Sequence, residues 1–363
     1  MVNWLNYKYY LIAVTSLLLL SLSNNKTEEV YSSHWGFYGH KRINRMAVFT
    51  LPPQMFGFYK EHIEYVTENA VNPDKRRYAV EGEAQRHYID LDHYYQPGED
   101  PNEAMPKRWE DAIAKYTEDT LQAYGIVPWH IVVMKYRLQK AFEAGDVDKI
   151  LLYSADIGHY VGDAHVPLHT TENYNGQMTN QKGIHGLWES RLVEINADSY
   201  DYFIGKAKYI EKPLDFAWEA VMESHRALDS VLSIERELTQ TFDSDKKYSY
   251  EQRGRVTTKV YSYEFSQAYH AQMNGMVERR LRQAIISVGS IWYTAWVDAG
   301  QPDLEKLRGK PVSTELLKEL EELDHQHAEG FLRGRSRAPD RRVPRDDRPA
   351  PDAGLPRAAH FHQ

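Results

Sequence analysis

Apolar residues recur at helical spacing through most of the chain, so the sequence predicts one helix after another. The spacing of three and four residues is typical of helices that bury one face. Pro106 and Gly125 bound one such stretch, and Pro128 and Gly145 bound the next. No convincing run of alternating, strand-like residues appears, and no repeat. We therefore expect an all-α protein with helices over 107–124, 128–144, 146–163, 188–197, 214–241, 261–299 and 313–329.

The two ends differ from this helical body. Lys8 precedes an apolar run over 11–20, and Ser21 and Ser23 follow it. This layout is typical of a secretory signal peptide, and the run is short for a membrane span of about 20 residues. From about Gly330 the chain is rich in Arg, Pro and Asp and loses its periodicity, which predicts disorder. We expect a signal peptide at 1–23, a linker at 24–34, one domain at 35–310, a charged helix at 311–329 and a disordered tail at 330–363. The location would be secreted or periplasmic, with an uncleaved membrane anchor less favoured.

Composition excludes some chemistry. The 363 residues contain no cysteine, so disulfides and thiolate metal sites are excluded. The formal net charge of −8 does not suggest broad attraction to nucleic acid, although a local basic groove remains open. The 26 tyrosines and eight tryptophans are expected mainly in core packing, with a few lining a pocket.

The densest group of potential metal ligands lies between residues 159 and 189. His159 and Asp163 are four residues apart, as are His185 and Glu189, so each pair can direct an imidazole and a carboxylate from one helix face to one ion. His169 follows a proline that would end the first helix. A single pair would indicate an ordinary surface hydrogen bond. Two pairs with a histidine between them predict a metal site, and imidazole with carboxylate suits zinc.

Four further candidates precede this group: Trp35, His40, Asp74 and His87. In order and spacing the whole set resembles the superfamily of zinc-dependent phospholipase C and S1/P1 nuclease. Its members begin at a Trp followed by a His and then supply an Asp and a His. They end with His-x-x-x-Asp-x-x-x-x-x-His and His-x-x-x-Glu/Asp. The motifs cover about residues 35–190, and helical character extends the resemblance to about 300. It implies one large helical domain with a metal cluster at the bottom of a cleft.

The resemblance also implies three zinc ions and a hydrolytic activity on phosphodiesters. Clustered dications would neutralise phosphate oxygens and lower the pKa of a bridging water, and Asp74 would act as the catalytic base or orient that water. Family members expose the Trp as the mature N-terminus, so cleavage after Ser23 would leave the third ion weaker, reorganised or absent. The implied ligands are Asp74, His87, His159 and Asp163 for the first ion, His169, His185 and Glu189 for the second, and Trp35 and His40 with a shared Asp163 for the third.

The substrate class remains open between two branches. Glu189 and the compact segment between His169 and His185 resemble the phospholipase branch. The spacing from Trp35 to His40 resembles the nuclease branch, as do the basic residues after Asp74. We expect phospholipase C-like cleavage slightly ahead of single-strand nuclease activity on DNA or RNA. A non-catalytic zinc-binding surface protein is a minor alternative.

Two further residues bear on this choice. Tyr88 could stack on a base and Asp90 could bind the edge of that base. Alternatively, Tyr88 packs in the core and Asp90 supports a ligand histidine. Apart from the phosphodiester substrate and a transient membrane-surface contact, no obligate protein partner is indicated.

Overall fold

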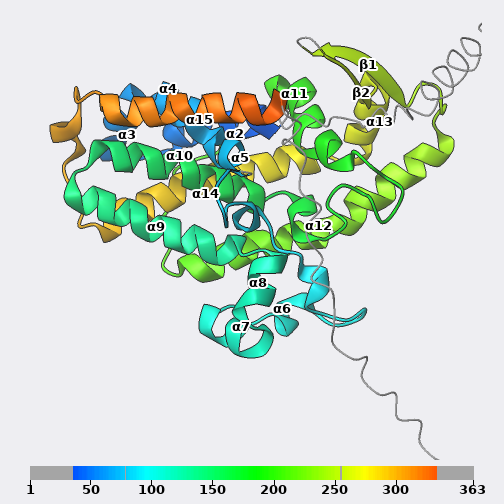
Figure 1. The fold of residues 1–363 in the computed structure, drawn as a ribbon, viewed down its shortest axis with the longest axis horizontal. Coiled ribbons are helices and arrows are strands. Elements are labelled where there is room, and N and C mark those ends of the chain that lie inside the picture. The colour runs from blue at the N-terminus through cyan, green and yellow to red at the C-terminus, as the bar shows by residue number, and fades with distance from the viewer. Residues whose placement is uncertain (1–35, 78, 254–255, 333–363) are drawn as a thin grey trace, which may run out of the picture.

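The computed structural model describes residues 36–77, 79–253 and 256–332. The predicted signal peptide, the linker, Trp35 and most of the predicted tail lie outside these ranges. Helices dominate, which confirms the all-α prediction, and Figure 1 shows the long ones packed against one another. The α-helices are α2 (Gly36–Ala47), α3 (Pro53–Glu61), α4 (Ile63–Glu68), α5 (Asn72–Arg76), α6 (Pro101–Ala104), α7 (Trp109–Tyr116), α8 (Glu118–Tyr124), α9 (Val127–Ala144), α10 (Val147–Ala164), α11 (Leu192–Asn196), α12 (Pro213–Thr241), α13 (Tyr263–Gln272), α14 (Met276–Asp298) and α15 (Thr314–Leu332).

The boundaries of α9 and α10 follow the expected local signals. Gly145 ends α9 in the left-handed conformation with φ 63°, which costs glycine little. Asp146 then caps α10, because its carboxylate accepts a hydrogen bond from the Lys149 amide at 3.1 Å. Short 3₁₀ segments η3 (Ala84–His87) and η5 (Pro167–Thr170) and the π-helical segment η6 (Gly186–Arg191) lie between the longer helices.

Two predicted helices are each divided in the structure. The predicted helix 107–124 breaks at Thr117, whose φ is 70° and whose hydroxyl caps α8 by accepting from the Thr120 amide. The predicted helix 261–299 becomes α13 and α14, with positive φ at Asn274 and Gly275 between them. A residue with positive φ cannot continue a right-handed helix, so each predicted helix ends there and a new one begins. The apolar spacing continues across both breaks, and for this reason the sequence predicted a single helix in each case.

The prediction that strands are lacking is wrong at one place. Strands β1 (Tyr248–Arg253) and β2 (Val256–Tyr261) form an antiparallel hairpin in which Tyr250 lies opposite Lys259. The alternating aromatic and β-branched residues of this stretch carried the signal. Arg191 of η6 makes a two-pronged ion pair with Glu251, at 3.0 and 2.5 Å, so the hairpin is fastened close to the predicted ligand Glu189.

Helix α10 runs through the centre of the molecule, in contact with α2, α9 and α14. Two of its glycines permit a close approach of α2. A Cβ at Gly158 would lie 1.9 Å from the Asn44 Oδ1, and one at Gly162 would lie 3.0 Å from the His40 Nδ1. Asn44 is fully buried and donates to the carbonyls of Val66 and Ala155, both at 3.0 Å. The spacing of α2 and α10 therefore depends on the absence of these two side chains.

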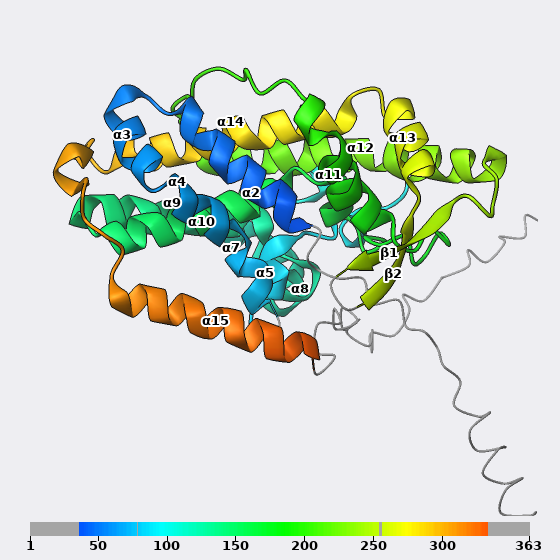
Figure 2. The ribbon, with the colours of Figure 1, turned by 90° about the horizontal axis from the view of Figure 1, so that it is seen from above.

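Helix α15 lies along one edge of the molecule, with its C-terminal half beside α5 (Figure 2). The Ser313 amide donates to the Asp148 carboxylate at 3.0 Å, and Lys75 pairs with Asp324 at 2.5 Å. The helix continues to Leu332, three residues beyond its predicted end. Within the ranges that the structure describes, we find no helix with the length and apolar character that a membrane crossing requires.

Candidate metal centre

All the predicted ligands that the structure describes lie in one cluster. Six elements supply them: α2, α5, η3, α10, η5 and η6, with His185 immediately before η6. Within each of four overlapping groups the donor atoms all lie within 4.8 Å of one another. The groups are His40, Asp74 and His159; His87, His159 and Asp163; His169, His185 and Glu189; and His40, Asp163 and Glu189.

Asp163 lies at the centre of this cluster, and its two oxygens face different imidazoles. Its Oδ2 lies 2.9 Å from the His87 Nδ1 and 3.3 Å from the His159 Nε2. Its Oδ1 lies 3.4 Å from the His40 Nε2 and 3.8 Å from the His169 Nε2. Only 1% of the side chain is exposed. This geometry suits a carboxylate shared between two metal positions.

Glu189 joins two of the groups. Its Oε2 lies 2.6 Å from the His185 Nε2 and 3.4 Å from the His169 Nε2, as the predicted second ligand set requires. Its Oε1 lies 3.4 Å from the His40 Nε2, a proximity that the predicted sets did not include. His40 therefore lies between two carboxylates, Asp163 and Glu189.

Asp74 faces the remaining histidines from α5. Its Oδ1 lies 3.6 Å from the His159 Nε2 and 3.8 Å from the His87 Nδ1. Its side chain is 18% exposed, whereas both histidines are fully buried. Asp74 is therefore less buried than the two histidines that it faces.

Most of the cluster histidines have the ring nitrogen that faces away from the centre held by a backbone carbonyl. The Nδ1 of His159 lies 2.8 Å from the Ala70 oxygen, and the Nδ1 of His169 lies 2.5 Å from the His87 oxygen. The Nδ1 of His185 lies 3.2 Å from the Tyr174 oxygen. When this nitrogen donates a proton to a carbonyl, Nε2 keeps its lone pair for a metal ion.

His40 and His87 depart from this arrangement. The His40 Nδ1 is buried, has no hydrogen-bond partner among the described residues and lies against Gly162. His87 is reversed, because its Nδ1 faces Asp163 and its Nε2 points to the buried Glu83, whose Oε1 is 3.8 Å away. Glu83 was missed from the sequence, although Glu83 and His87 show the same four-residue carboxylate–imidazole spacing as the recognised pairs.

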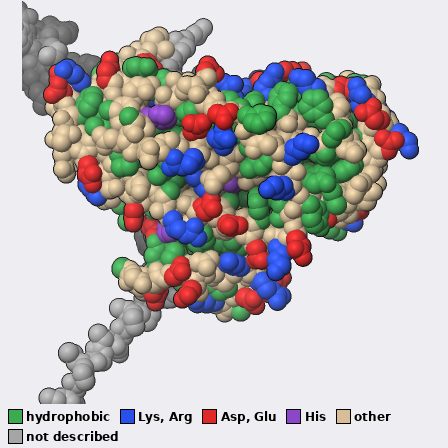
Figure 3. Space-filling view, turned by 180° about the vertical axis from the view of Figure 1, so that it is seen from behind, with side chains coloured by type: hydrophobic (Ala, Val, Ile, Leu, Met, Phe, Trp, Pro, Cys, Tyr) green, Lys and Arg blue, Asp and Glu red, His purple; other side chains and the backbone are tan. Residues whose placement is uncertain are grey.

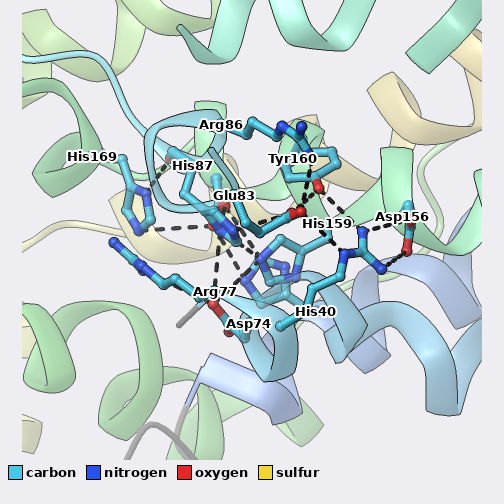
Figure 4. A network of polar contacts seen from close by, with 12 residues as sticks. His40, Asp74, Arg77, Glu83, Arg86, His87, Asp156, His159, Tyr160 and His169 are labelled. Carbon is cyan, nitrogen blue, oxygen red and sulfur yellow. Dashed lines mark hydrogen bonds and ion pairs between the residues drawn. The ribbon is translucent and has the colours of Figure 1, made fainter. Parts of the chain in front are cut away.

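Arg76 and Arg77 are among the basic residues that follow Asp74 in the sequence, and Figure 4 shows Arg77 close to the cluster. The Arg77 Nη1 lies 4.0 Å from the Asp74 Oδ1, and the Arg77 side chain is 22% exposed. Arg76 points away from the cluster and pairs with Glu83 and Asp156 at 3.1 and 2.7 Å. Of these two arginines, Arg77 is the one that lies beside Asp74.

The electrostatics of the cluster favour a bound cation. Burial alone would lower the pKa of His159, but the carboxylates of Asp163 and Asp74 outweigh burial and raise it well above 6.5. Burial alone would raise the pKa of Asp163, yet the adjacent His159 and His169 hold it well below 3.8. The carboxylates are therefore ionised and stabilise any positive charge placed among them.

The donor set fits zinc. Imidazole nitrogens and carboxylate oxygens are preferred zinc ligands, and the chain supplies no thiolates to compete. The outward-facing nitrogens of His159, His169 and His185 are already fixed by backbone carbonyls. The donors are thus oriented by the fold itself, which is typical of a metal site rather than of a chance group of polar residues.

The two proposed substrate residues are both buried. Tyr88 is 5% exposed, and its hydroxyl donates to the Ala123 carbonyl at 3.4 Å. A Cβ at Gly125 would lie 2.6 Å from the Tyr88 ring, so this ring is covered by the 123–125 segment. Asp90 is 1% exposed, and its amide donates to the Tyr124 carbonyl. In this conformation a base cannot stack on Tyr88, and the packing interpretation is favoured.

Comparison with known proteins adds one finding. The sequence model of the family described as "S1/P1 Nuclease" matches residues 35–291, more than half of the chain. A search of curated proteins gave no match. The matched range begins at Trp35 and includes every residue of the cluster.

Proposed function

Because the chain belongs to the S1/P1 nuclease family, it is a zinc-dependent phosphodiester hydrolase, and we propose that its substrate is single-stranded nucleic acid. The observation that carries this proposal is the match to the S1/P1 nuclease family over residues 35–291, a range that includes the convergent carboxylates Asp74, Asp163 and Glu189 and the five histidines around them. Arg77 beside Asp74 supports an anionic substrate, because a guanidinium can bind two phosphate oxygens at once.

We assign each described cluster residue a metal-binding role. His87, His159, Asp163 and Asp74 would hold one ion, and His169, His185 and Glu189 a second. His40 with Asp163 and Glu189 offers a third position, to which the predicted Trp35 would add its backbone groups. When bound, zinc supplies positive charge for the phosphate oxygens and a water molecule of lowered pKa.

The residues of the chain have separate tasks in this reaction. Asp74 is the more exposed carboxylate, so we assign it to accept the proton of the water that attacks phosphorus. The Arg77 guanidinium would neutralise charge that develops on the phosphate oxygens. The buried Asp163 orients the histidines that surround it.

A phospholipase C-like activity is the second candidate. The closing ligand Glu189 and the short 169–185 segment favour it. So do exposed aromatic residues: Phe49 is 50% exposed and Phe203 is 90% exposed, and a hydrogen bond from Ala207 to the Thr50 carbonyl joins their segments. Figure 3 shows hydrophobic side chains gathered on one half of the back of the molecule, with Lys and Arg among them. Such a surface suits transient contact with anionic lipid.

The deciding experiment compares three substrates. Zinc-loaded protein is assayed on single-stranded DNA, RNA and phosphatidylcholine. We expect nucleic acid to be cleaved faster, and Arg77→Ala to lower kcat/KM on it by about 10- to 100-fold, since a hydrogen bond to a charged group contributes about 1.5–3 kcal/mol. The control is Arg108→Ala, because Arg108 immediately precedes α7 and its side chain is 72% exposed. Faster turnover of phosphatidylcholine would favour the second candidate. Full zinc content without any turnover would favour a non-catalytic zinc protein.

We also propose that the protein is exported, with the signal peptide at 1–23 removed. The support is the sequence pattern alone, which lies outside the described residues. Expression in a secreting host, followed by N-terminal sequencing of the exported product, tests it. A mature chain that begins at Trp35 would supply a free amine to the third metal position, whereas retention of the apolar segment in the membrane fraction would contradict cleavage.

A further inference from the structure

A buried carboxylate lies beside the metal centre, across the His87 ring from Asp74 and Asp163. Glu83 has no exposed surface, and its Oε1 lies 3.8 Å from the His87 Nε2. The opposite nitrogen of the same ring, Nδ1, lies 2.9 Å from the Asp163 Oδ2 and 3.8 Å from the Asp74 Oδ1. The His87 ring therefore stands between the metal-facing carboxylates and Glu83 (Figure 4).

Several groups hold Glu83 in this position. The Tyr160 hydroxyl donates to its Oε1. Arg76 and Arg86 donate to its Oε2, at 3.1 and 2.8 Å. Arg76 is in turn fixed by Asp156, whose Oδ2 lies 2.7 Å from Arg76 Nη2. The carboxylate therefore has little freedom to turn away from His87.

Packing alone does not account for a charged carboxylate buried at Glu83. Burying an ionised carboxylate is costly, and a buried ion pair often stabilises a fold no better than apolar residues of the same size. His159, His169 and His185 are oriented by backbone carbonyls, which need no buried charge. Among the described cluster histidines, His87 is the one whose outward-facing nitrogen, here Nε2, lies near a carboxylate instead.

We propose that Glu83 is a positioning residue of the metal centre, which receives the Nε2–H of His87 and so presents Nδ1 to the metal. The separation of 3.8 Å is longer than a direct hydrogen bond. A cation on Nδ1 makes the Nε2–H more acidic, so metal binding favours a shorter contact and a carboxylate there strengthens metal binding. The inference rests on the proposed zinc chemistry and adds to it a residue that touches neither metal nor substrate.

The experiment measures zinc affinity in Glu83→Gln by competition with a chelating dye, together with the visible spectrum of the cobalt-substituted protein. Glutamine keeps the shape but removes the charge. We expect zinc binding about 10- to 100-fold weaker, as is typical when a residue behind a metal-bound histidine is replaced. The cobalt spectrum should change as well, because the His87 ring is no longer fixed.

The matched control is Glu235→Gln. Glu235 is also a buried carboxylate, 1% exposed, and it pairs with Lys247 at 2.8 Å and accepts from the Tyr261 hydroxyl at 3.3 Å. It contacts none of the cluster residues. We expect this variant to lose thermal stability but to keep wild-type zinc affinity and the wild-type cobalt spectrum.

A second variant keeps the test decisive if Glu83→Gln fails to fold. Tyr160→Phe removes only the hydroxyl that donates to Glu83, and a smaller loss of zinc affinity is expected. Wild-type affinity and spectrum in the Glu83 variant, or in Tyr160→Phe if only that one folds, would overturn the inference. So would an equal loss of affinity in Glu235→Gln. If wild-type protein binds no zinc, the proposed function itself fails.

Discussion

Replacing Asp163 with asparagine tests the centre of the cluster with the least change in shape. Asp163 is 1% exposed, and its two oxygens lie between 2.9 and 3.8 Å from four imidazoles. The amide removes the negative charge that stabilises cations on both sides. Removing one partner of a buried charge pair costs about 3–5 kcal/mol. At 1.36 kcal/mol for each factor of ten, zinc binding should weaken by roughly 10²- to 10⁴-fold.

The assay equilibrates both proteins in zinc buffers, measures metal content by emission spectroscopy and measures Kd by chelator competition. Glu235→Gln is the control, because Glu235 is a buried acid, 1% exposed, that pairs with Lys247 outside the cluster. Phosphodiester hydrolysis should disappear in Asp163→Asn at zinc concentrations that saturate the control. If Asp163→Asn kept wild-type zinc content and a Kd within about threefold of wild type, the shared-carboxylate reasoning would be refuted.

Three further outcomes are expected. Chelation of zinc should abolish hydrolysis and lower the melting temperature by about 10 °C when free zinc had been a thousandfold above Kd, because that binding contributes about 4 kcal/mol; an unchanged melting temperature after verified zinc removal would contradict this. Gly158→Ala should lower the free energy of unfolding by about 1–3 kcal/mol or more, since the new methyl would meet Asn44. Gly186→Ala should not lower it, because a Cβ added at Gly186 has no atom within 4 Å. Denaturant unfolding of the two variants compares these free energies. Burial lowers the pKa of His130 from 6.5 to about 3, so the unfolded chain binds the extra proton between these values and stability falls as pH falls through that window. Wild-type protein should therefore lose about 2–3 kcal/mol more than His130→Gln between pH 7.5 and 4.5, and equal losses in chemical denaturation would show that His130 is not held neutral.

The features that the sequence predicts well are those decided within one or two helical turns. His159 and Asp163 face the same way because they are four residues apart on α10, and the rest of the fold does not alter that. The same holds for His185 and Glu189, although they lie at a π-helical segment rather than an α-helix. Caps such as Asp146 are equally local.

The features that were missed depend on distant segments. Glu83 shares the spacing of the recognised pairs, but its role is visible only when Tyr160 and Arg76 close around it from other elements. Likewise, a glycine or threonine in an apolar stripe does not reveal whether the chain adopts a positive φ there, as at Thr117. The sequence left open whether Tyr88 stacks on a base or packs in the core, because nothing near Tyr88 in the sequence indicates that the 123–125 segment covers it.

Gly158 and Gly162 of α10 bind no ligand, yet their positions are among those at which the site tolerates a larger residue least. His40 reaches Asp163 from another helix only because Gly158 and Gly162 leave room for α2, and its ring then stacks on that of His159 with centroids 3.8 Å apart. In a related chain that kept every ligand but carried alanine at these two positions, the helices would be pushed apart and His40 would be withdrawn from the shared carboxylate. A comparison of the ligand residues alone would indicate that this chain has an intact metal site. Whether the same ligands form a metal site therefore depends on the spacing between the α2 and α10 backbones, which the missing Cβ atoms of the two glycines permit.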